Sequence, residues 1–422
     1  MAKQFSFSDL VGKLTESVDK EITILSDNEY ANIPDWIHTG NYMLNAQISG
    51  SIWKGIPAGR IVQFAGESGT GKTFLTLNCV REAQKKGYKV IYIDTEYAID
   101  EDMMETFGVD PKNVVLIQKN DIPEVKQIIG VIRKELDEKR EKNYSIDKIM
   151  LVIDSLGQMI TSKATEDAIS GKIVRDMTKQ QELKILFAQL TTLVGKYQMP
   201  CIITNHVYAM IGAYGNQTMA SGGSGQKFSA SVTLKFTKAS DKDGDGRKMG
   251  IVVTSKPDKQ RFALPIDIKF HISFIRGMNQ FIGLQSYLDF HKHGVGPGKL
   301  EEEIRSEPLL DENGEQVVIR KKPQFKEIKT GNFTYTKDIS GKEWAVKHLG
   351  TSVKISELFS EKVFTHELLE RVGTTIEEIF AFPEAEDLES DLEGLYDDSN
   401  DSEEGDGKET IQDILDEEGV EV

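Results

Sequence analysis

The sequence predicts an α/β fold in which a mostly parallel β-sheet carries helices on both faces. Short apolar segments, each the length of a buried strand, alternate with longer segments whose apolar residues recur at helical spacing. A glycine-rich loop at residues 66–73 joins the first such strand to the first such helix. Segments 232–236, 250–254 and 265–272 then follow one another with only turns between them, so we expect them to extend one edge of the sheet in antiparallel fashion.

The individual elements follow from the same patterns. Residues 149–153 are apolar at every position, as expected of a strand that is buried on both faces. Gly87 supplies a stop for the helix that follows the glycine-rich loop. The other expected strands are 60–65, 88–94 and 200–204, and the expected helices are 74–86, 125–136 and 185–194.

We place the core of this fold at residues 36–283, and a smaller segment precedes it. Residues 1–35 combine a helix over 7–18, with Ser8 as its N-cap, and a strand at 21–25. Elements this small cannot bury an apolar face by themselves, so we expect them to pack on the core or on a neighbouring subunit. The segment is therefore predicted to serve oligomerisation.

A second small domain is expected at residues 284–382, with helices at about 284–291 and 355–380. It carries a basic cluster formed by Arg320, Lys321, Lys322, Lys326 and Lys329. These cations are compatible with a solvated hairpin edge and equally with contact to DNA, and both interpretations stay open.

The net charge of −17 is concentrated at the C-terminus. Residues 384–422 hold 18 Asp and Glu and one Lys, which leaves 50 acidic and 50 basic residues in the rest of the chain. We expect 383–422 to be a disordered acidic tail, either a docking motif or a solubilising segment, that could compete with DNA for cationic surface. Because the acidity is confined to this tail, it does not exclude nucleic-acid binding by the fold.

The bulk composition is that of an ordinary globular protein, at 39% hydrophobic and 28% charged residues. Cys79 and Cys201 lie in an expected helix and an expected buried strand without metal-ligand spacing, so we expect reduced core thiols. The start of the chain leads into no apolar leader, and no run of about 18 apolar residues occurs. We therefore expect a cytoplasmic protein with no membrane partner.

The glycine-rich loop indicates nucleotide chemistry. It fits G-x-x-x-x-G-K-[ST], a loop whose backbone N–H groups cradle phosphate oxygens at a helix N-terminus. We expect Lys72 to reach the β- and γ-phosphates and the Thr73 hydroxyl to bind Mg²⁺, so ATP and Mg²⁺ are the predicted cofactors. The predicted phosphate contacts are Gly66, Glu67, Ser68, Gly69, Thr70, Gly71, Lys72 and Thr73.

Three polar residues at the ends of expected strands extend this site. Asp154 occupies the usual position of the carboxylate that is linked to Mg²⁺. Glu96 can orient and deprotonate an attacking water. His206 stands where a polar group could sense the γ-phosphate, and the long glycine-rich segment 207–227 follows it. Apolar and tyrosine side chains beside flexible glycines suit stacking on nucleic-acid bases.

The ordered set of motifs resembles the RecA family of strand-exchange recombinases, in particular its phage-encoded, UvsX-like branch. The resemblance covers roughly residues 37–275 and implies a RecA-like ATPase core, while the region after 284 resembles only the phage branch. The matching segments are His38-Thr39-Gly40, 55–61, 66–73, Ile93-Asp94-Thr95-Glu96, Ile153-Asp154-Ser155-Leu156 and 222–228.

The resemblance also implies roles for single residues. Glu96 would be the general base, with Lys72 and His206 as further catalytic residues, and His206 replaces the Gln of cellular members. Asp100 and Lys256 would complete the nucleotide contacts, Lys256 by reaching ATP from the adjoining subunit. The family's adenine-stacking aromatic is replaced near Met103.

Two DNA-binding loops are implied, at about 159–175 and 207–227. Tyr208 and Met210 stand where cellular members carry basic side chains, so other groups must contact the phosphates there. Ile211 corresponds to a residue that wedges between base triplets. The predicted DNA contacts are Ile211, Gly212, Gly222, Gly223 and Lys227.

The implied function is that of an ATP-dependent DNA recombinase, which forms a homo-oligomeric helical filament on single-stranded DNA and pairs it with homologous duplex DNA. The implied partners are a mediator protein and a single-strand-binding protein. A hexameric helicase on the same core, a scaffold that uses ATP only as a switch, and a small-molecule kinase are the alternatives. The pairing of Glu96 with Asp154 argues against the scaffold, and no lid or acceptor pocket for a kinase is apparent. The glycines at 222–223 favour the recombinase over the helicase.

Overall fold

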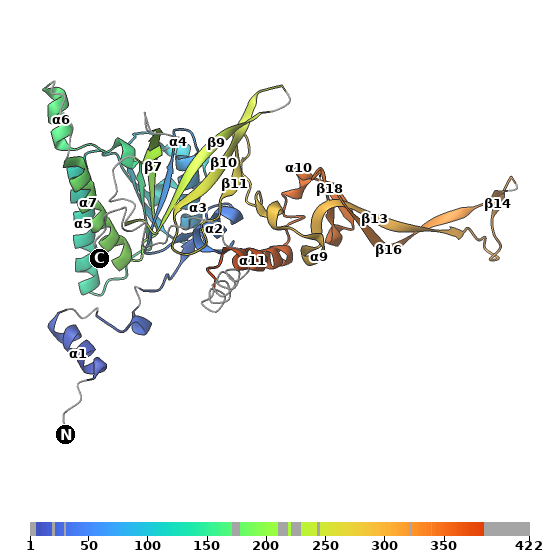
Figure 1. The fold of residues 1–422 in the computed structure, drawn as a ribbon, viewed down its shortest axis with the longest axis horizontal. Coiled ribbons are helices and arrows are strands. Elements are labelled where there is room, and N and C mark those ends of the chain that lie inside the picture. The colour runs from blue at the N-terminus through green and yellow to red at the C-terminus, as the bar shows by residue number, and fades with distance from the viewer. Residues whose placement is uncertain are drawn as a thin grey trace, which may run out of the picture. The chain divides into compact units, whose positions relative to one another are not determined.

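The computed structural model shows a ten-stranded sheet at the centre of the fold (Figure 1). The chain divides into two units, Met1–Ala381 and Phe382–Val422, and all elements described below belong to the first. The structure describes residues 6–18, 22–28, 31–170, 178–209, 218–220, 229–242, 245–320, 322–338 and 340–383.

The strand order of this sheet is β12-β11-β10-β9-β3-β7-β6-β4-β5, with β8 paired to β7. From β9 to β5 all neighbours are parallel, whereas β9, β10, β11 and β12 pair antiparallel. The predicted α/β fold with an antiparallel extension is therefore confirmed. The strands are β3 (Ile61–Gly66), β4 (Lys89–Asp94), β5 (Val114–Ile117), β6 (Ile149–Asp154), β7 (Cys201–Ala209), β8 (Thr218–Ala220), β9 (Val232–Lys242), β10 (Lys248–Lys259), β11 (Ile268–Ser273) and β12 (Gly277–Met278).

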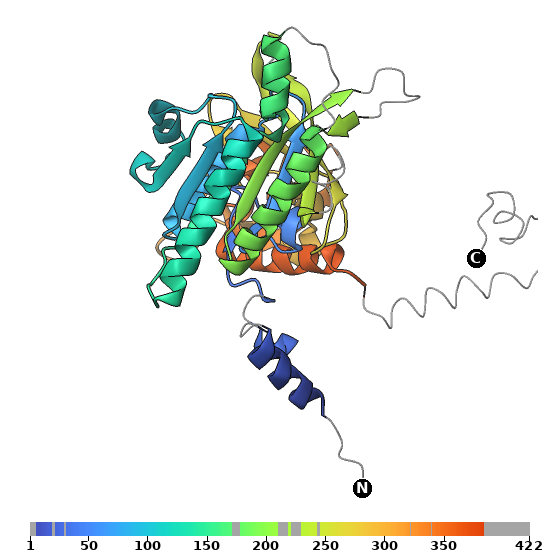
Figure 2. The same cartoon turned by 90° about the vertical axis from the view of Figure 1, so that its left-hand side faces the viewer.

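Helices cover both faces of the sheet. In β6, Val152 belongs to one buried apolar cluster and Ile153 to another, because successive side chains of a strand point to opposite faces. Helices α5 (Ile122–Glu141) and α7 (Thr178–Lys196) lie side by side and supply the second cluster (Figure 2).

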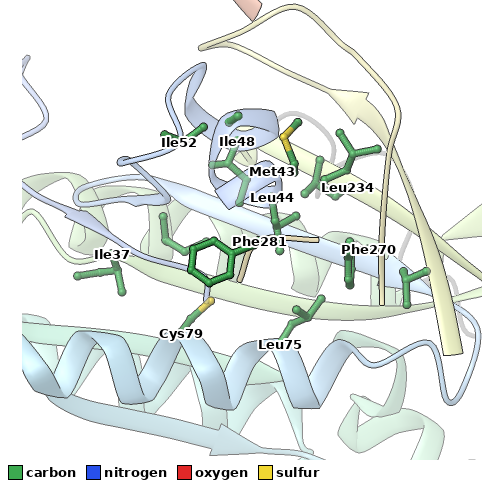
Figure 3. Packing of buried hydrophobic residues seen from close by; sticks show 14 of the residues in the cluster. Ile37, Met43, Leu44, Ile48, Ile52, Leu75, Cys79, Leu234, Phe270 and Phe281 are labelled. Carbon is green, nitrogen blue, oxygen red and sulfur yellow. The ribbon is translucent and has the colours of Figure 1, made fainter. Parts of the chain in front are cut away.

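The first cluster contains α2 (Tyr42–Ser49) and α3 (Lys72–Lys85), whose Leu44 and Leu75 are completely buried (Figure 3). Cys79 belongs to this cluster and Cys201 to the other; both are unpaired, as expected. Short elements connect the layers: β1 (Trp36–Ile37), β2 (Ile56–Pro57), α4 (Glu101–Thr106), α6 (Ser162–Ile169) and the 3₁₀ turns η2 (Pro111–Asn113) and η3 (Leu156–Gln158).

The N-terminal segment differs from prediction in two details. Helix α1 (Phe7–Ser17) is capped by Ser6, not Ser8: the Ser6 hydroxyl accepts the N–H of Asp9 at 3.1 Å, and the Asp9 carboxylate accepts the N–H of Ser6 at 3.0 Å. Instead of a strand reaching residue 25, a 3₁₀ turn η1 spans Leu25–Asp27. A strand needs a neighbour for its backbone groups, and no pairing to this segment occurs in the part of the chain that the structure describes.

Residues 284–382 form a second sheet, several short helical pieces and one longer helix. The sheet has the order β16-β13-β17-β18, and β13 and β16 pair as a long two-stranded ribbon (Figure 1). Its strands are β13 (Val295–Pro308), β16 (Phe325–Lys337), β17 (Glu343–Val346) and β18 (Thr351–Lys354), and β14 (Val318–Ile319) pairs with β15 (Lys322–Pro323).

The helices expected in this region are each interrupted. The first is a 3₁₀ turn η4 (Leu284–Tyr287) followed by α9 (Phe290–His293), and a further turn η5 spans Lys347–Leu349. The second divides into α10 (Ile355–Leu358) and α11 (His366–Phe380), because Thr365 caps a new helix there. Apolar residues of α11 belong to the same cluster as α2 and α3, and the domain boundary at 283/284 stays a prediction.

Within the described ranges, no helix combines the length and the apolar composition that crossing a bilayer requires.

The half-buried imidazole of His38 predicts a pH dependence of stability. Burial lowers its pKa from 6.5 to about 4, and its Nδ1 accepts the N–H of Gly40 at 2.9 Å. The unfolded chain therefore binds a proton at His38 more readily than the folded chain does. Above pH 6.5 this residue does not lower the free energy of unfolding, but that free energy decreases as the pH falls from 6.5 toward 4. The loss is about 2 kcal/mol at pH 5.

We expect His38→Asn, which can accept the same hydrogen bond without titrating, to lose less stability than the wild type between pH 7 and pH 5 in urea unfolding. The matched control is His366→Asn, since the His366 side chain is 77% exposed. An equal loss in the His38 variant and the wild type would contradict the prediction.

Candidate active site

Four adjacent parallel strands bring the predicted site residues to one edge of the sheet. In the order β3-β7-β6-β4, Gly66 lies in register with His206, and Asp94 lies in register with Asp154. Glu96 follows β4 by two residues. Because the carboxyl ends of parallel strands meet at one edge, residues far apart in the sequence share one crevice there.

The loop of residues 66–73, called the phosphate loop below, leaves β3 and enters α3. Gly69 and Gly71 have φ angles of 72° and 86°, a conformation that side chains with a Cβ adopt rarely. A Cβ at Gly71 would lie only 2.5 Å from Cδ1 of Ile272. Residues 67–69 are exposed, so their backbone forms an open cradle that fits phosphate oxygens.

The side chain of Lys72 forms hydrogen bonds with the backbone of this loop. Its buried ammonium donates hydrogen bonds to the carbonyl oxygens of Gly66 and Glu67, both at 2.9 Å. Burial lowers the pKa of Lys72, while the carboxylates of Asp154 and Glu96 act in the opposite direction. Phosphate oxygens can compete with the two carbonyls for this ammonium because they carry full negative charge.

Asp154 is a buried carboxylate with three hydroxyl donors. It accepts hydrogen bonds from Thr73 Oγ1 at 2.8 Å, from the Tyr92 hydroxyl at 2.9 Å and from Thr204 Oγ1. Burial raises the pKa of Asp154, and the three hydrogen bonds only partly offset that effect. The carboxylate is thereby fixed next to the first turn of α3.

Glu96 and His206 are in direct contact. His206 Nε2 lies 2.7 Å from Glu96 Oε1, and the Ser155 hydroxyl also donates to Glu96. Burial by itself would raise the pKa of Glu96, but the hydrogen bonds from Ser155 and His206 outweigh it and place the pKa below its ordinary value. Glu96 is therefore ionised at neutral pH and can accept a proton from water.

Thr73 and Asp154 fit a magnesium ion that is shared with a bound nucleotide. Both present hard oxygen atoms, and they lie within hydrogen-bonding distance of one another. Mg²⁺ usually takes one or two protein oxygens together with phosphate oxygens and water. The described ranges contain no group of three or more His, Cys, Asp or Glu that could hold a metal alone.

The remaining predicted residues are not all brought to this edge. Asp100 caps α4 by accepting the N–H of Met103 at 2.7 Å, and Lys256 of β10 forms an ion pair with Asp267 at 3.2 Å. Their nucleotide contacts stay predictions. The predicted DNA contacts Ile211, Gly212, Gly222, Gly223 and Lys227 lie outside the described residues.

Sequence reasoning missed two residues that the structure brings to the site. Tyr92 shares a strand face with Asp94, which was the signal that its hydroxyl could reach the edge. Lys238 donates to the carbonyl oxygen of Ser68 at 2.6 Å. It lies two residues beyond Phe236, where the strand was expected to end, and β9 in fact continues to residue 242.

Comparison with known proteins agrees with this geometry. Residues 12–279 match the RecA N-terminal domain family. The chain belongs to the RecA family. The resemblance that the motifs indicated is thereby confirmed for most of the chain.

Individual RecA-family relatives extend the match. A recombination and repair protein of Enterobacteria phage T4 is 27% identical over 407 residues, which cover 92% of this chain and 98% of that protein. Protein RecA of Ruminococcus albus is 29% identical over 250 residues, or 58% of each chain. Protein RecA of Cytophaga hutchinsonii is 30% identical over 278 residues, or 64% of this chain and 73% of that protein. The phage relative thus also covers sequence outside the RecA domain.

We expect Tyr92→Phe to lower the free energy of unfolding by about 1–2 kcal/mol, because a buried carboxylate loses one of its donors. Urea unfolding at pH 7 measures the change. Tyr144→Phe is the matched control, since the Tyr144 side chain is 61% exposed. Unchanged stability in the Tyr92 variant would show that its hydroxyl does not support Asp154.

Proposed function

We propose that this RecA-family chain is an ATP-dependent DNA recombinase, which forms a filament on single-stranded DNA and catalyses homologous pairing and strand exchange. The observation that carries the proposal is the contact between Glu96 and His206 beside the phosphate loop. It joins a carboxylate suited to ATP hydrolysis to the strand β7, which leads into the predicted DNA-binding segment 207–227.

The hydrolysis step follows from the positions of the side chains. The phosphate loop and Lys72 would bind the β- and γ-phosphates, and Thr73 with Asp154 would hold Mg²⁺, which would neutralise phosphate charge when bound. The oxygen of the attacking water bonds to the γ-phosphorus, and Glu96 accepts a proton from that water. The bond from that phosphorus to the bridging oxygen breaks, and ADP leaves with the electron pair.

His206 gives the same site a signalling role. When ATP binds, His206 Nε2 gives up its hydrogen bond with the Glu96 carboxylate and forms one with a γ-phosphate oxygen instead. That exchange moves the end of β7 and so orders the segment after it for DNA binding. Hydrolysis and phosphate release reverse the exchange, which makes the DNA-bound state depend on ATP.

A recombinase is favoured over a hexameric helicase on the same core. The supporting observation is that the relative matched over 92% of this chain is named a recombination and repair protein. The partners are then single-stranded DNA, homologous duplex DNA, a mediator protein and a single-strand-binding protein. Lys256 completes the ATP site of the adjoining subunit, and Asp100 contributes to the nucleotide contacts.

Uncovered apolar surfaces support filament assembly. Helix α1 has no buried residue, and Phe7 is 70% exposed. Val115 on the edge strand β5 is 60% exposed, and Val131 on α5 is 56% exposed. We propose that α1 of one copy packs on this edge of the next copy. An apolar hollow at the edge is lined by Ile91, Val115, Ile117, Gln127, Ile128, Val131 and Ile132.

ATP hydrolysis should increase strongly when single-stranded DNA is added, and Lys72→Ala and Glu96→Gln should each lower the stimulated rate at least ~100-fold. Lys72→Ala should also weaken ATP binding, whereas Glu96→Gln should preserve it. Glu101→Gln on α4 is the control, because it removes an exposed carboxylate nearby. Turnover that ignores DNA would contradict the proposal and favour the kinase alternative.

Replacing Phe7 and Leu10 of α1 together by Glu should abolish most filament assembly on single-stranded DNA, since charges would replace the apolar contact. Electron microscopy and sedimentation velocity measure assembly, and the thermal unfolding midpoint should stay unchanged. Glu16→Lys is the control, because it lies on the opposite face of α1. Normal filaments from the double variant would rule out α1 as the contact.

A further inference from the structure

A second lysine touches the phosphate loop from β9. Phe236 of β9 lies in register with Gly66 at the end of β3, so β9 continues past the point where β3 becomes the loop. Lys238 stands on this continuation, and its ammonium donates to the carbonyl oxygen of Ser68 at 2.6 Å. The phosphate loop is thus bound by a cation from a strand that lies beside it.

Two ammonium groups therefore occupy three consecutive carbonyls of the loop. Lys72 takes those of Gly66 and Glu67, and Lys238 takes that of Ser68. The two lysines have different surroundings, because Lys72 is buried and Lys238 is exposed. Lys72 must release its carbonyls to bind phosphate, whereas Lys238 can keep its own.

The peptide geometry gives the Lys238 contact a consequence for ligand binding. In a trans peptide the carbonyl and the following N–H point in opposite directions. An ammonium that fixes the Ser68 carbonyl therefore also fixes the N–H of Gly69, which is one of the backbone donors of the cradle. A side chain at position 69 would displace the Lys238 ammonium from its present place, since a Cβ there would lie 2.7 Å from it.

The charge of Lys238 also acts on the site. Its bond to Ser68 is made to a neutral carbonyl, so this contact does not neutralise its charge. Lys238 is among the groups that lower the pKa of Lys72, so its charge acts on the lysine that is predicted to contact the phosphates. A cation beside the phosphate loop attracts a triphosphate more strongly than a ligand with fewer negative charges.

We propose that Lys238 is a second cation of the triphosphate site, a positioning residue that orients the peptide between Ser68 and Gly69 and adds positive potential over the phosphate loop. The proposal rests on the proposed ATP-binding function. It assigns to β9 a part in nucleotide binding that the phosphate-loop motif does not reveal.

The test compares binding of Mg²⁺–ATPγS and Mg²⁺–ADP to the full chain by isothermal titration calorimetry. Lys238→Gln keeps a polar side chain but carries no charge and is one bond shorter than lysine, and we expect it to bind ATPγS about three- to tenfold more weakly. The loss for ADP should be smaller, and both losses should shrink at high salt. Lys238→Arg should bind within about twofold of the wild type. The fold control is the thermal unfolding midpoint without nucleotide, which should be the same for all variants.

Lys242→Gln is the matched control, since it removes the same charge from the same face of β9 four residues further on, and it should bind like the wild type. Lys72→Ala distinguishes ATP binding at the phosphate loop from the additional role of Lys238. If it loses ATPγS while Lys238→Gln binds as tightly as the wild type, only the role of Lys238 is overturned. If Lys238→Arg is as impaired as Lys238→Gln, the charge has no role and the proposal also fails. A wild-type chain that binds no ATPγS would overturn the proposed function together with this inference.

Discussion

The hydrogen-bonding requirement of one buried carboxylate organises the site. A charge in the protein interior is costly unless donors surround it, and Asp154 obtains donors from Thr73 on α3, Tyr92 on β4 and Thr204 on β7. Because Asp154 itself ends β6, a single side chain joins four elements at the edge of the sheet. The positions of the phosphate loop and of Glu96 depend on this junction, since the loop leads into α3 and Glu96 follows β4.

Patterns that are local in the sequence predicted most of the fold and much of the site. The apolar segments located the parallel strands except β5, and the phosphate-loop motif located Lys72 and Thr73, because spacing within a few residues fixes strand and loop geometry. Asp154 and His206 were found because polar residues at the carboxyl ends of parallel strands converge.

What the sequence did not predict depends on contacts between distant residues. Lys238 lies about 170 residues from Ser68, and no local pattern couples them. The expected strand reaching residue 25 failed for a related reason, since strand propensity describes a segment but not its partner. The N-cap moved from Ser8 to Ser6 because the side chain of Asp9 decides between two serines that look equivalent in the sequence.

The ribbon of β13 and β16 gives the protein unequal resistance to local opening. Two strands alone bury little apolar surface, and Ile304 and Phe325 on this ribbon are 57% and 54% exposed. Its amide hydrogens should therefore exchange with solvent through local openings that cost much less free energy than unfolding the central sheet. A thermal unfolding midpoint measured on the whole chain would report the stability of the central sheet and not that of the ribbon. We expect the ribbon to separate and re-form on its own while the edge of the central sheet that carries the phosphate loop stays intact.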